Sequence, residues 1–407
     1  MDLLLRPGKL HGCVMPPPSK SELMRLILAA ALAEGTSVVR PTADSGDLRA
    51  ALACASALGA TWEEYGGGLR IRGTGAQILR ERPRFCCGES AAVLRFFLPV
   101  SLTLCGGGEF LCEGRLPDRP SKPFYDLFDR QGISYAWDGG LLRVSGALRP
   151  GEYSLPGDVS SQFFSGLLFA LPLLDGPSWL RCDALPESAD YLRMTLAVLR
   201  RAGIRISEGG DGFSVFPGKY RPLETEAERD WSQAAFWLTA AALGSELRVD
   251  GLTEDSLQAD RRAPKMIAQL LREGDAEMDF SQNPDLLPPL AVLAALRQGE
   301  TRLCGAARLR YKESDRLSSV SAMLASLGAD VKEYADGLLL RGAAFLRGGT
   351  EIDCAGDHRV AMAAAVAAAR CKDPIVLHGA ECVRKSYPDF WEQYRALGGD
   401  FDVVKLG

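Results

Sequence analysis

The sequence predicts an α/β protein made of two similar lobes, each built from copies of one repeated unit. With 407 residues the chain exceeds the size at which a single hydrophobic core keeps growing, so two domains are expected. A helical stretch that ends at glycine, a short strand, a Gly-rich turn and a second strand recur along the chain. The recurring glycines are Gly59, Gly132, Gly203, Gly274, Gly328 and Gly398. Their spacing is about seventy residues, apart from a shorter interval between Gly274 and Gly328.

The copy around Gly328 shows why this pattern predicts a helix followed by a hairpin. Apolar residues recur at three- and four-residue intervals from Leu317 to Leu327, which places them on one helix face. Gly328 then ends the helix, because glycine tolerates the left-handed conformation at that position. Alternating apolar residues follow on both sides of Ala335-Asp336-Gly337, which is typical of two strands joined by a tight turn.

Three such copies can share one core, because a helix with one apolar stripe and strands with one apolar face cover each other. Six copies then make two lobes. The alternative is that glycine after a helix is only a common stop signal, but the regular spacing favours a repeat. A solenoid is disfavoured, because the copies are long and carry different insertions.

Composition and charge exclude several classes of protein. The net charge is −5 and no run of five like charges occurs, which argues against nucleic-acid binding and against a basic membrane patch. The eleven cysteines lack zinc-site spacing and are expected to be reduced. No signal-peptide pattern occurs near Met1, and the apolar stretches at 286–296 and 360–369 are too short to span a membrane. A cytoplasmic location is therefore expected.

Two polar clusters in the first half of the chain stand at predicted helix starts. Lys20, Ser21 and Arg25 follow three prolines and precede an apolar helix, where exposed backbone N–H groups and cations favour an anion. An ordinary capped helix explains the same residues equally well. Ser160-Ser161-Gln162 precedes another apolar stretch, and its serines could serve only as helix caps.

Three further clusters lie in the second half of the chain. Arg310 to Arg316 is densely charged, which could also be a solvated helix face. Asp357-His358-Arg359 opens an Ala-rich helix, and a histidine beside an arginine there suits anion binding or proton transfer, although a lone histidine is usually structural. Arg384 to Phe390 again places basic residues before a helix.

In order and spacing, five of these segments together resemble the 5-enolpyruvylshikimate-3-phosphate synthase family of enolpyruvyl transferases. The segments are Lys20-Ser21 to Arg25, Ser160-Ser161-Gln162, Lys312 to Arg316, Asp357-His358-Arg359 and Lys385 to Asp389. The resemblance implies two lobes of three βαβαββ repeats each, an inside-out α/β barrel fold with the active site in the cleft between the lobes. It further implies a discontinuous lobe from residues 1–18 and 230–407, and a continuous lobe from residues 19–229.

The resemblance also implies an activity. Members of the family transfer the enolpyruvyl group of phosphoenolpyruvate to the 5-hydroxyl of shikimate 3-phosphate and release phosphate, in the biosynthesis of chorismate and aromatic amino acids. They need no metal or organic cofactor, and the substrates are small molecules. A monomer is expected for this chain, with no nucleic-acid or membrane partner.

Site residues carry over by position in this sequence. The implied catalytic residues are Asp285, Glu313, Lys20, His358 and Lys385. The implied shikimate 3-phosphate site consists of Lys20, Ser21, Arg25, Ser160, Ser161, Gln162, Ser188, Tyr191, Asp285 and Lys312. The implied phosphoenolpyruvate site consists of Lys20, Ala91, Arg119, Gln162, Arg316, His358, Arg359 and Lys385. Cations are required in such sites, because a buried phosphate or carboxylate without partners is very costly.

Some positions depart from the family pattern. Ala91 stands where the family commonly has glycine against phosphoenolpyruvate and the inhibitor glyphosate, which predicts lowered glyphosate sensitivity. Arg308 stands where many relatives have asparagine, which leaves that substrate contact open. Two alternatives remain: a UDP-N-acetylglucosamine enolpyruvyl transferase, and a relative that binds phosphorylated metabolites without catalysis. Both acidic residues, Asp285 and Glu313, argue against the second alternative.

Overall fold

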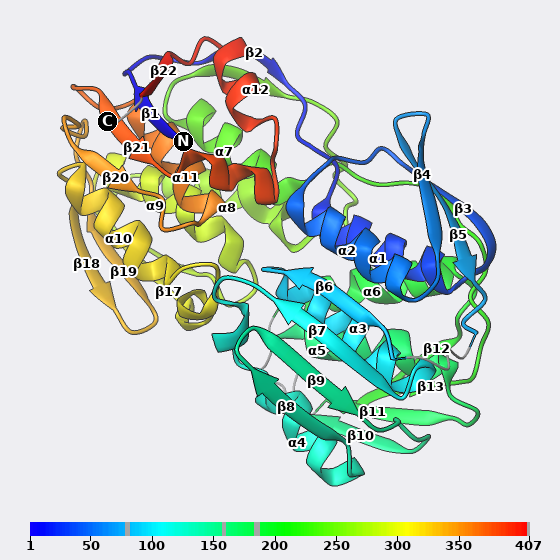
Figure 1. The fold of residues 1–407 in the computed structure, drawn as a ribbon. Coiled ribbons are helices and arrows are strands. Elements are labelled where there is room, and N and C mark those ends of the chain that lie inside the picture. The colour runs from blue at the N-terminus through cyan, green and yellow to red at the C-terminus, as the bar shows by residue number, and fades with distance from the viewer. Residues whose placement is uncertain (78–81, 157–159, 183–187, 405–407) are drawn as a thin grey trace. The chain divides into compact units, whose positions relative to one another are not determined.

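A computed structural model describes residues 1–77, 82–156, 160–182 and 188–404, and the chain divides into two units. One unit contains residues 1–17 and 229–407, and the other contains residues 18–228. Each unit repeats the same arrangement of strands and helices (Figure 1). Among the described residues, the strands form six sheets, of which five have four strands and one has two.

The middle copy of the continuous unit shows the repeated arrangement. Its elements are β6 (Arg84–Gly88), α3 (Ala91–Leu104), β7 (Gly107–Cys112), α4 (Lys122–Gln131), β8 (Ser134–Asp138) and β9 (Leu141–Ser145). The strand order is β6-β7-β9-β8, in which β6 and β7 are parallel and β8 and β9 form an antiparallel hairpin. The copy is therefore a βαβαββ unit, as the resemblance implied.

Two further copies complete the continuous unit. One contains β10 (Glu152–Leu155), α5 (Ser161–Ala170), β11 (Ser178–Cys182), α6 (Ala189–Arg201), β12 (Ile206–Gly209) and β13 (Gly212–Val215). The other contains β14 (Glu224–Glu226), α1 (Lys20–Leu32), β3 (Glu34–Arg40), α2 (Gly46–Ala57), β4 (Thr61–Tyr65) and β5 (Gly68–Thr74). In the latter sheet, β14 from the end of the unit pairs with β3 near its beginning, so the two ends of the unit meet in one sheet.

The discontinuous unit contains two complete copies. One contains β16 (Ala276–Asp279), α9 (Leu287–Leu296), β17 (Glu300–Cys304), α10 (Arg316–Ser326), β18 (Asp330–Tyr334) and β19 (Gly337–Arg341). The other contains β20 (Glu351–Asp353), α11 (His358–Ala368), β21 (Ile375–His378), α12 (Phe390–Ala396), β22 (Phe401–Val404) and β1 (Asp2–Leu5). The N-terminal strand β1 lies between β21 and β22, so it ties the start of the chain to its last copy.

The copy around Gly328 folds as its sequence predicts. Asp315 accepts a hydrogen bond from the N–H of Ser318 at the start of α10, and Leu317 and Leu324 are fully buried. Gly328 follows the helix with φ of 85°, the left-handed conformation that glycine adopts without strain. Across the following turn Tyr334 pairs with Gly337, which confirms the predicted hairpin.

The sixth copy is incomplete. It contains β2 (His11–Val14), α7 (Trp231–Ala242), β15 (Glu246–Val249) and α8 (Ala263–Leu270). Within the described part of the chain, β2 and β15 form a parallel sheet of two strands without a hairpin. After Gly274 the chain enters β16 of the next copy directly. The lack of this hairpin explains the short interval between Gly274 and Gly328.

The central helices lie in the interior of each unit, and the sheets lie outside them. Eleven of the thirteen residues of α1 are buried, and α9 and α11 are buried on all sides. A helix that is apolar all round must be covered on every face. By contrast, every residue of β4 is exposed. The fold class predicted from the sequence is confirmed, with the sixth copy shortened.

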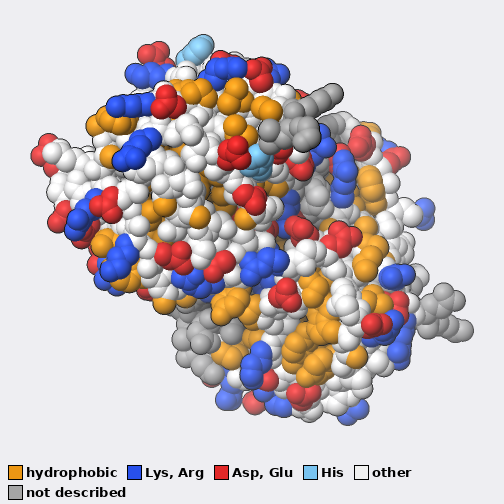
Figure 2. Space-filling view, turned by 60° about the vertical axis from the view of Figure 1, so that its left-hand side comes forward, with side chains coloured by type: hydrophobic (Ala, Val, Ile, Leu, Met, Phe, Trp, Pro, Cys, Tyr) orange, Lys and Arg blue, Asp and Glu red, His pale blue; other side chains and the backbone are white. Residues whose placement is uncertain are grey.

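The surface agrees with the modest net charge. On the face drawn in Figure 2, basic and acidic side chains are interspersed over both units. None of the helices in the described ranges is both long enough and apolar enough to cross a bilayer.

Close helix packing in the continuous unit generates a stability prediction. A Cβ atom added at Gly166 in α5 would overlap the carbonyl oxygen of Arg95 in α3 and lie 3.3 Å from Pro99 Cγ. Gly166→Ala therefore forces the two helices apart, and we expect it to lower the free energy of unfolding by about 1–3 kcal/mol, measured by urea denaturation. Gly210→Ala is the matched control, because its added methyl group meets no atom within 4 Å. Equal stability of the two variants would contradict the prediction.

Candidate functional site

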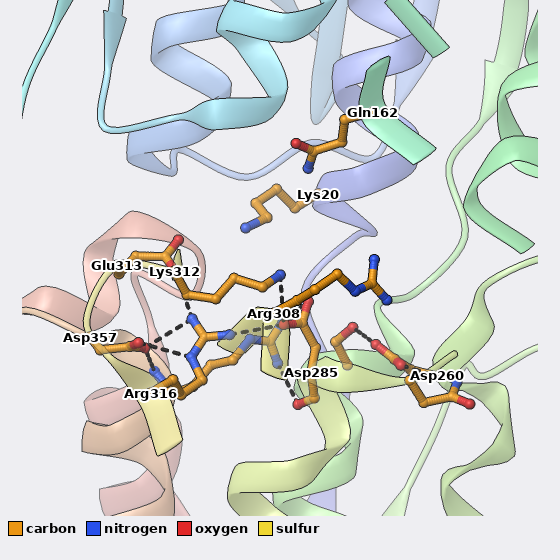
Figure 3. Close-up of polar contacts among 12 residues, drawn as sticks. Lys20, Gln162, Asp260, Asp285, Arg308, Lys312, Glu313, Arg316 and Asp357 are labelled. Carbon is orange, nitrogen blue, oxygen red and sulfur yellow. Dashed lines mark hydrogen bonds and ion pairs between the residues drawn. The ribbon is translucent and has the colours of Figure 1, made fainter. Parts of the chain in front are cut away.

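Four segments of the discontinuous unit bring charged side chains together (Figure 3). The segments are η4 (Pro284–Leu286), the residues just before α10, the start of α11 and η6 (Ala380–Lys385). Each segment lies at or next to the beginning of a helix or short helical turn. The sequence places polar residues there because helix starts leave backbone N–H groups that need partners.

Arg316, the first residue of α10, is the centre of this cluster and is 1% exposed. Its guanidinium donates to Asp285 Oδ1 at 2.9 Å, to Glu313 Oε2 at 2.6 Å and to Asp357 Oδ2 at 2.8 Å. Burial opposes its charge, but the three carboxylates outweigh burial and raise the pKa of Arg316 above its usual value. One guanidinium therefore holds three acids that lie far apart in the sequence.

Asp285 also contacts two further cations. Lys312 Nζ lies 3.6 Å from Asp285 Oδ1, and Arg359 Nη2 lies 3.2 Å from Asp285 Oδ2. Burial lowers the pKa of Lys312 to about 8. The negative charge of Asp285 opposes this lowering, and the positive charge of Arg316 adds to it. Arg308, whose Nη2 donates to the carbonyl of Ser281 at 2.6 Å, adds to this lowering.

Glu313 joins the cluster to the end of η6. Lys385 Nζ lies 3.4 Å from Glu313 Oε1. Asp357 precedes α11 and accepts the N–H of Arg359 at 2.9 Å, so it caps the helix and binds Arg316 at the same time. His358, the first residue of α11, is buried beside it. The two acids expected to be catalytic, Asp285 and Glu313, thus bind the same guanidinium.

In the continuous unit, Arg25 is buried at the start of α1. It donates to Thr195 Oγ1 at 2.7 Å and to the carbonyls of Ser21 and Tyr191 at 2.6 and 3.2 Å. Burial lowers the pKa of Arg25 to about 10. Lys20, at the same helix start, pairs with Asp47 Oδ2 at 2.9 Å. The structure therefore brings Ser21, Arg25 and Tyr191 together, through the backbone carbonyls of Ser21 and Tyr191.

A second basic position lies between α3 and α5. Arg95 Nη1 donates to Gln162 Oε1 at 2.9 Å, and its guanidinium lies 4.4 Å from the centre of the Phe163 ring. Burial and the neighbouring Arg119 lower the pKa of Arg95 to about 9. Two cations close together in a partly buried place favour an anionic ligand. Sequence reasoning missed Arg95, for which the only signal was an arginine within an apolar helix.

The remaining expected residues occupy helix starts in the continuous unit. Ser160 accepts the N–H of Gln162 at 3.4 Å and so has the capping role that was its alternative interpretation. Ser161 is buried, and Ala91 is the buried first residue of α3. Ser188 precedes α6 in the left-handed conformation, with φ of 60°. Residues 157–159, next to Ser160, lie outside the described residues.

The discontinuous unit holds one further acid that sequence reasoning missed. Asp260, in η3 (Ala259–Arg262), is 1% exposed and accepts a hydrogen bond from the hydroxyl of Ser232. Burial, and next the charge of Asp285, raise the pKa of Asp260 to about 6. In the sequence it stands in an unremarkable charged segment, so only its burial distinguishes it.

The chain is similar to known proteins over nearly its whole length. A model of the family EPSP synthase (3-phosphoshikimate 1-carboxyvinyltransferase) matches residues 5–394. The 3-phosphoshikimate 1-carboxyvinyltransferase of Clostridium kluyveri is 38% identical, with 99% of each chain covered, and that of Clostridium beijerinckii is 37% identical, with 100% of this chain and 99% of the relative covered.

Solved structures show the same fold. An EPSP synthase from Acinetobacter baumannii superposes with a TM-score of 0.80 at 24% identity, covering 99% of this chain and 100% of that one. The enolpyruvyl transferase NikO from Streptomyces tendae superposes with a TM-score of 0.78 at 17% identity, covering 100% of this chain and 99% of that one.

The arrangement around Arg316 generates a prediction. Arg316→Met removes the guanidinium and leaves Asp285, Glu313 and Asp357 without its charge, so we expect the free energy of unfolding to fall by about 3–5 kcal/mol at pH 7. Acidification protonates the carboxyl groups, so the deficit shrinks as the pH falls. Urea denaturation at several pH values measures both effects.

The control for Arg316→Met is Arg341→Met. Arg341 pairs with Glu300 at 3.0 Å on the surface of the same unit, where both side chains are exposed. Its loss should leave the free energy of unfolding nearly unchanged, because exposed ion pairs contribute little to stability. An equal fall in the free energy of unfolding in both variants would show that the buried network contributes no more to stability than an exposed ion pair.

Proposed function

This chain belongs to the EPSP synthase (3-phosphoshikimate 1-carboxyvinyltransferase) family, and on that premise we propose the reaction that it catalyses. It transfers the enolpyruvyl group of phosphoenolpyruvate to the 5-hydroxyl of shikimate 3-phosphate and releases phosphate. The reaction belongs to the shikimate pathway of aromatic amino acid biosynthesis. The family match and the names of the relatives support this acceptor over UDP-N-acetylglucosamine.

One observation carries the proposal: Asp285 and Glu313 converge on Arg316, with Lys312, Arg359 and Lys385 within 4 Å of one acid or the other. The reaction needs a group that accepts the hydroxyl proton and a group that protonates the methylene carbon. It also needs positive charge to bind two anionic substrates. A cluster in which acids and cations are in contact can provide both the proton transfer and the positive charge.

The proposed chemistry is an addition followed by an elimination. In the addition, the oxygen of the 5-hydroxyl bonds to C2 of phosphoenolpyruvate, and Asp285 takes the proton of that hydroxyl. At the same time Glu313 delivers a proton to the methylene carbon. In the elimination, Glu313 takes a proton back from the new methyl group, which restores the double bond, and phosphate leaves the tetrahedral intermediate with the proton that Asp285 returns. Lys385, next to Glu313, can exchange a proton with it, and Lys20 and His358 stabilise developing charge.

We propose that the substrate groups lie where the family pattern places them. Shikimate 3-phosphate contacts Lys20, Ser21, Arg25, Ser160, Ser161, Gln162, Ser188, Tyr191, Asp285 and Lys312. Phosphoenolpyruvate contacts Lys20, Ala91, Arg119, Gln162, Arg316, His358, Arg359 and Lys385. To the second set we add Arg95, because its lowered pKa beside Arg119 favours a bound anion.

The two units are the proposed domains, and a cytoplasmic monomer remains a prediction.

Replacement of Asp285 tests the proposed chemistry. Asp285→Asn keeps the shape of the side chain but removes the base, so we expect kcat to fall about 10²–10⁴-fold. Binding of shikimate 3-phosphate, measured by calorimetry, should change much less. The assay is phosphate release from phosphoenolpyruvate plus shikimate 3-phosphate. UDP-N-acetylglucosamine as acceptor is the control, and turnover with it alone would overturn the proposed function.

Ala91 allows a test of inhibitor selectivity. Its methyl group lies at the buried start of α3, where the proposed site binds phosphoenolpyruvate. Glyphosate is longer than the substrate, so the methyl group should crowd it more. We expect Ala91→Gly to lower the inhibition constant of glyphosate at least about tenfold, which corresponds to relief of roughly 1.4 kcal/mol. An unchanged inhibition constant would refute the expected role of Ala91.

A further inference from the structure

A buried acid, Asp260, lies behind η4 and has no role in the proposed chemistry. It comes from η3, far from Asp285 in the sequence but close to it in the fold (Figure 3). The hydroxyl of Ser232 in α7 donates to Asp260 Oδ2, and the side-chain amide of Asn283 lies 3.4 Å from Asp260 Oδ1. Because burial of a carboxylate is costly, such a group needs these donors.

Asn283 links Asp260 to the catalytic acid. Its amide nitrogen also donates to the carbonyl of Ala259, and its amide oxygen accepts from Arg262 Nη1 at 3.3 Å. Asn283 is 3% exposed and immediately precedes η4, the turn that carries Asp285. The side chain of Asn283 is therefore held by η3 on more than one side, and the position of Asp285 depends on that anchor.

Asp260 and Asp285 also influence each other through charge. Burial and the negative charges of Asp285 and Asp230 raise the pKa of Asp260, whereas the Ser232 hydroxyl and Arg359 lower it, and the net value is about 6. Repulsion between like charges is reciprocal, so an ionised Asp260 also makes Asp285 bind a proton more readily. The charge of each acid therefore acts on the other.

The charged groups around this pair come from several elements. Arg359 in α11 contacts Asp285 and reduces the repulsion between the two acids. Arg316 and Lys312 contact Asp285 at Oδ1, so their positive charges stabilise the negative charge of that acid. Asp230 stands at the start of α7. The charge of Asp260 opposes these cations and keeps Asp285 a stronger base than they alone would allow.

We propose that Asp260 is a positioning residue for the transfer reaction, which fixes the turn that carries Asp285 and places a second negative charge behind that carboxylate. This inference rests on the proposed function, in which Asp285 accepts the proton of the 5-hydroxyl. Without the charge of Asp260, Asp285 keeps its contacts with the cations but becomes a weaker base. The consequence is a change in the pH dependence of turnover, which a merely structural role would leave unaltered.

Asp260→Asn tests the proposal because asparagine keeps the shape of the side chain and removes its charge. The measurement is kcat from pH 5 to pH 9, by phosphate release with phosphoenolpyruvate plus shikimate 3-phosphate. We expect the fall of kcat near pH 6, where Asp260 takes up a proton, to be lost in this variant. On the plateau, kcat falls about three- to tenfold because the base is weaker, and KM changes less than about twofold.

A second variant keeps the test decisive if Asp260→Asn fails to fold. Ser232→Ala retains the carboxylate but removes its hydroxyl donor, which raises the pH at which Asp260 takes up a proton. The fall of kcat should therefore move to higher pH in this variant. The matched control is Asp279→Asn, which removes an exposed acid that accepts from Ser281 N–H at 2.9 Å near the same turn. Its pH profile should match that of the unaltered enzyme.

The outcomes separate this inference from the proposed function. Failure of the unaltered enzyme to release phosphate from the two substrates would overturn the proposed function. Normal turnover of the unaltered enzyme, together with unshifted midpoints in Asp260→Asn and Ser232→Ala, would overturn only the role of Asp260. A uniform loss of kcat at every pH would likewise overturn it, because that pattern indicates structural damage alone.

Discussion

The charged cluster of the discontinuous unit depends on one buried guanidinium. Arg316 binds Asp285, Glu313 and Asp357, which come from three separate segments. Each carboxylate would be costly to bury without this partner, and the guanidinium would be equally costly without them. The segments must therefore adopt a single mutual arrangement, and the acids and cations of the proposed site are placed by that requirement.

The inside-out fold explains why these charges lie at helix starts. Because the central helices are buried on all sides, a helix start within the interior leaves N–H groups without intrahelical partners, and polar groups such as Asp357 can satisfy them there. Asp357 has two roles there, since the same carboxylate caps α11 and binds Arg316. In the continuous unit, Arg25 in α1 is buried and Arg95 in α3 is partly buried, and both have lowered pKa values, which an anionic ligand would oppose.

The incomplete sixth copy shows which parts of the repeat the core requires. In complete copies the outer hairpin strands are largely exposed, as β4 and β18 illustrate. The helices of the incomplete copy remain in the core, with Trp237 of α7 fully buried. The other strand of each hairpin packs on the core, as the fully buried Leu338 and Leu340 of β19 show, so the incomplete copy lacks that strand but keeps its central helices. The shortened connection leads from α8 to β16 and then to the turn that carries Asp285.

The sequence by itself determined the features that local patterns encode. The apolar spacing before Gly328 and the turn at Ala335-Asp336-Gly337 predicted a helix and a hairpin, because side-chain periodicity and glycine conformation act over a few residues. The order of the motifs, through resemblance, predicted the family and the pair Asp285 and Glu313.

Only the tertiary structure decided which polar groups are buried and which meet. Asp260 stands in a segment whose local pattern is ordinary, and Arg95 looked like one basic residue in an apolar helix. Their burial and the lack of a hairpin in the sixth copy arise from packing between distant segments. Burial changes the free energy of a charge far more than sequence neighbours do, so no local pattern reports it.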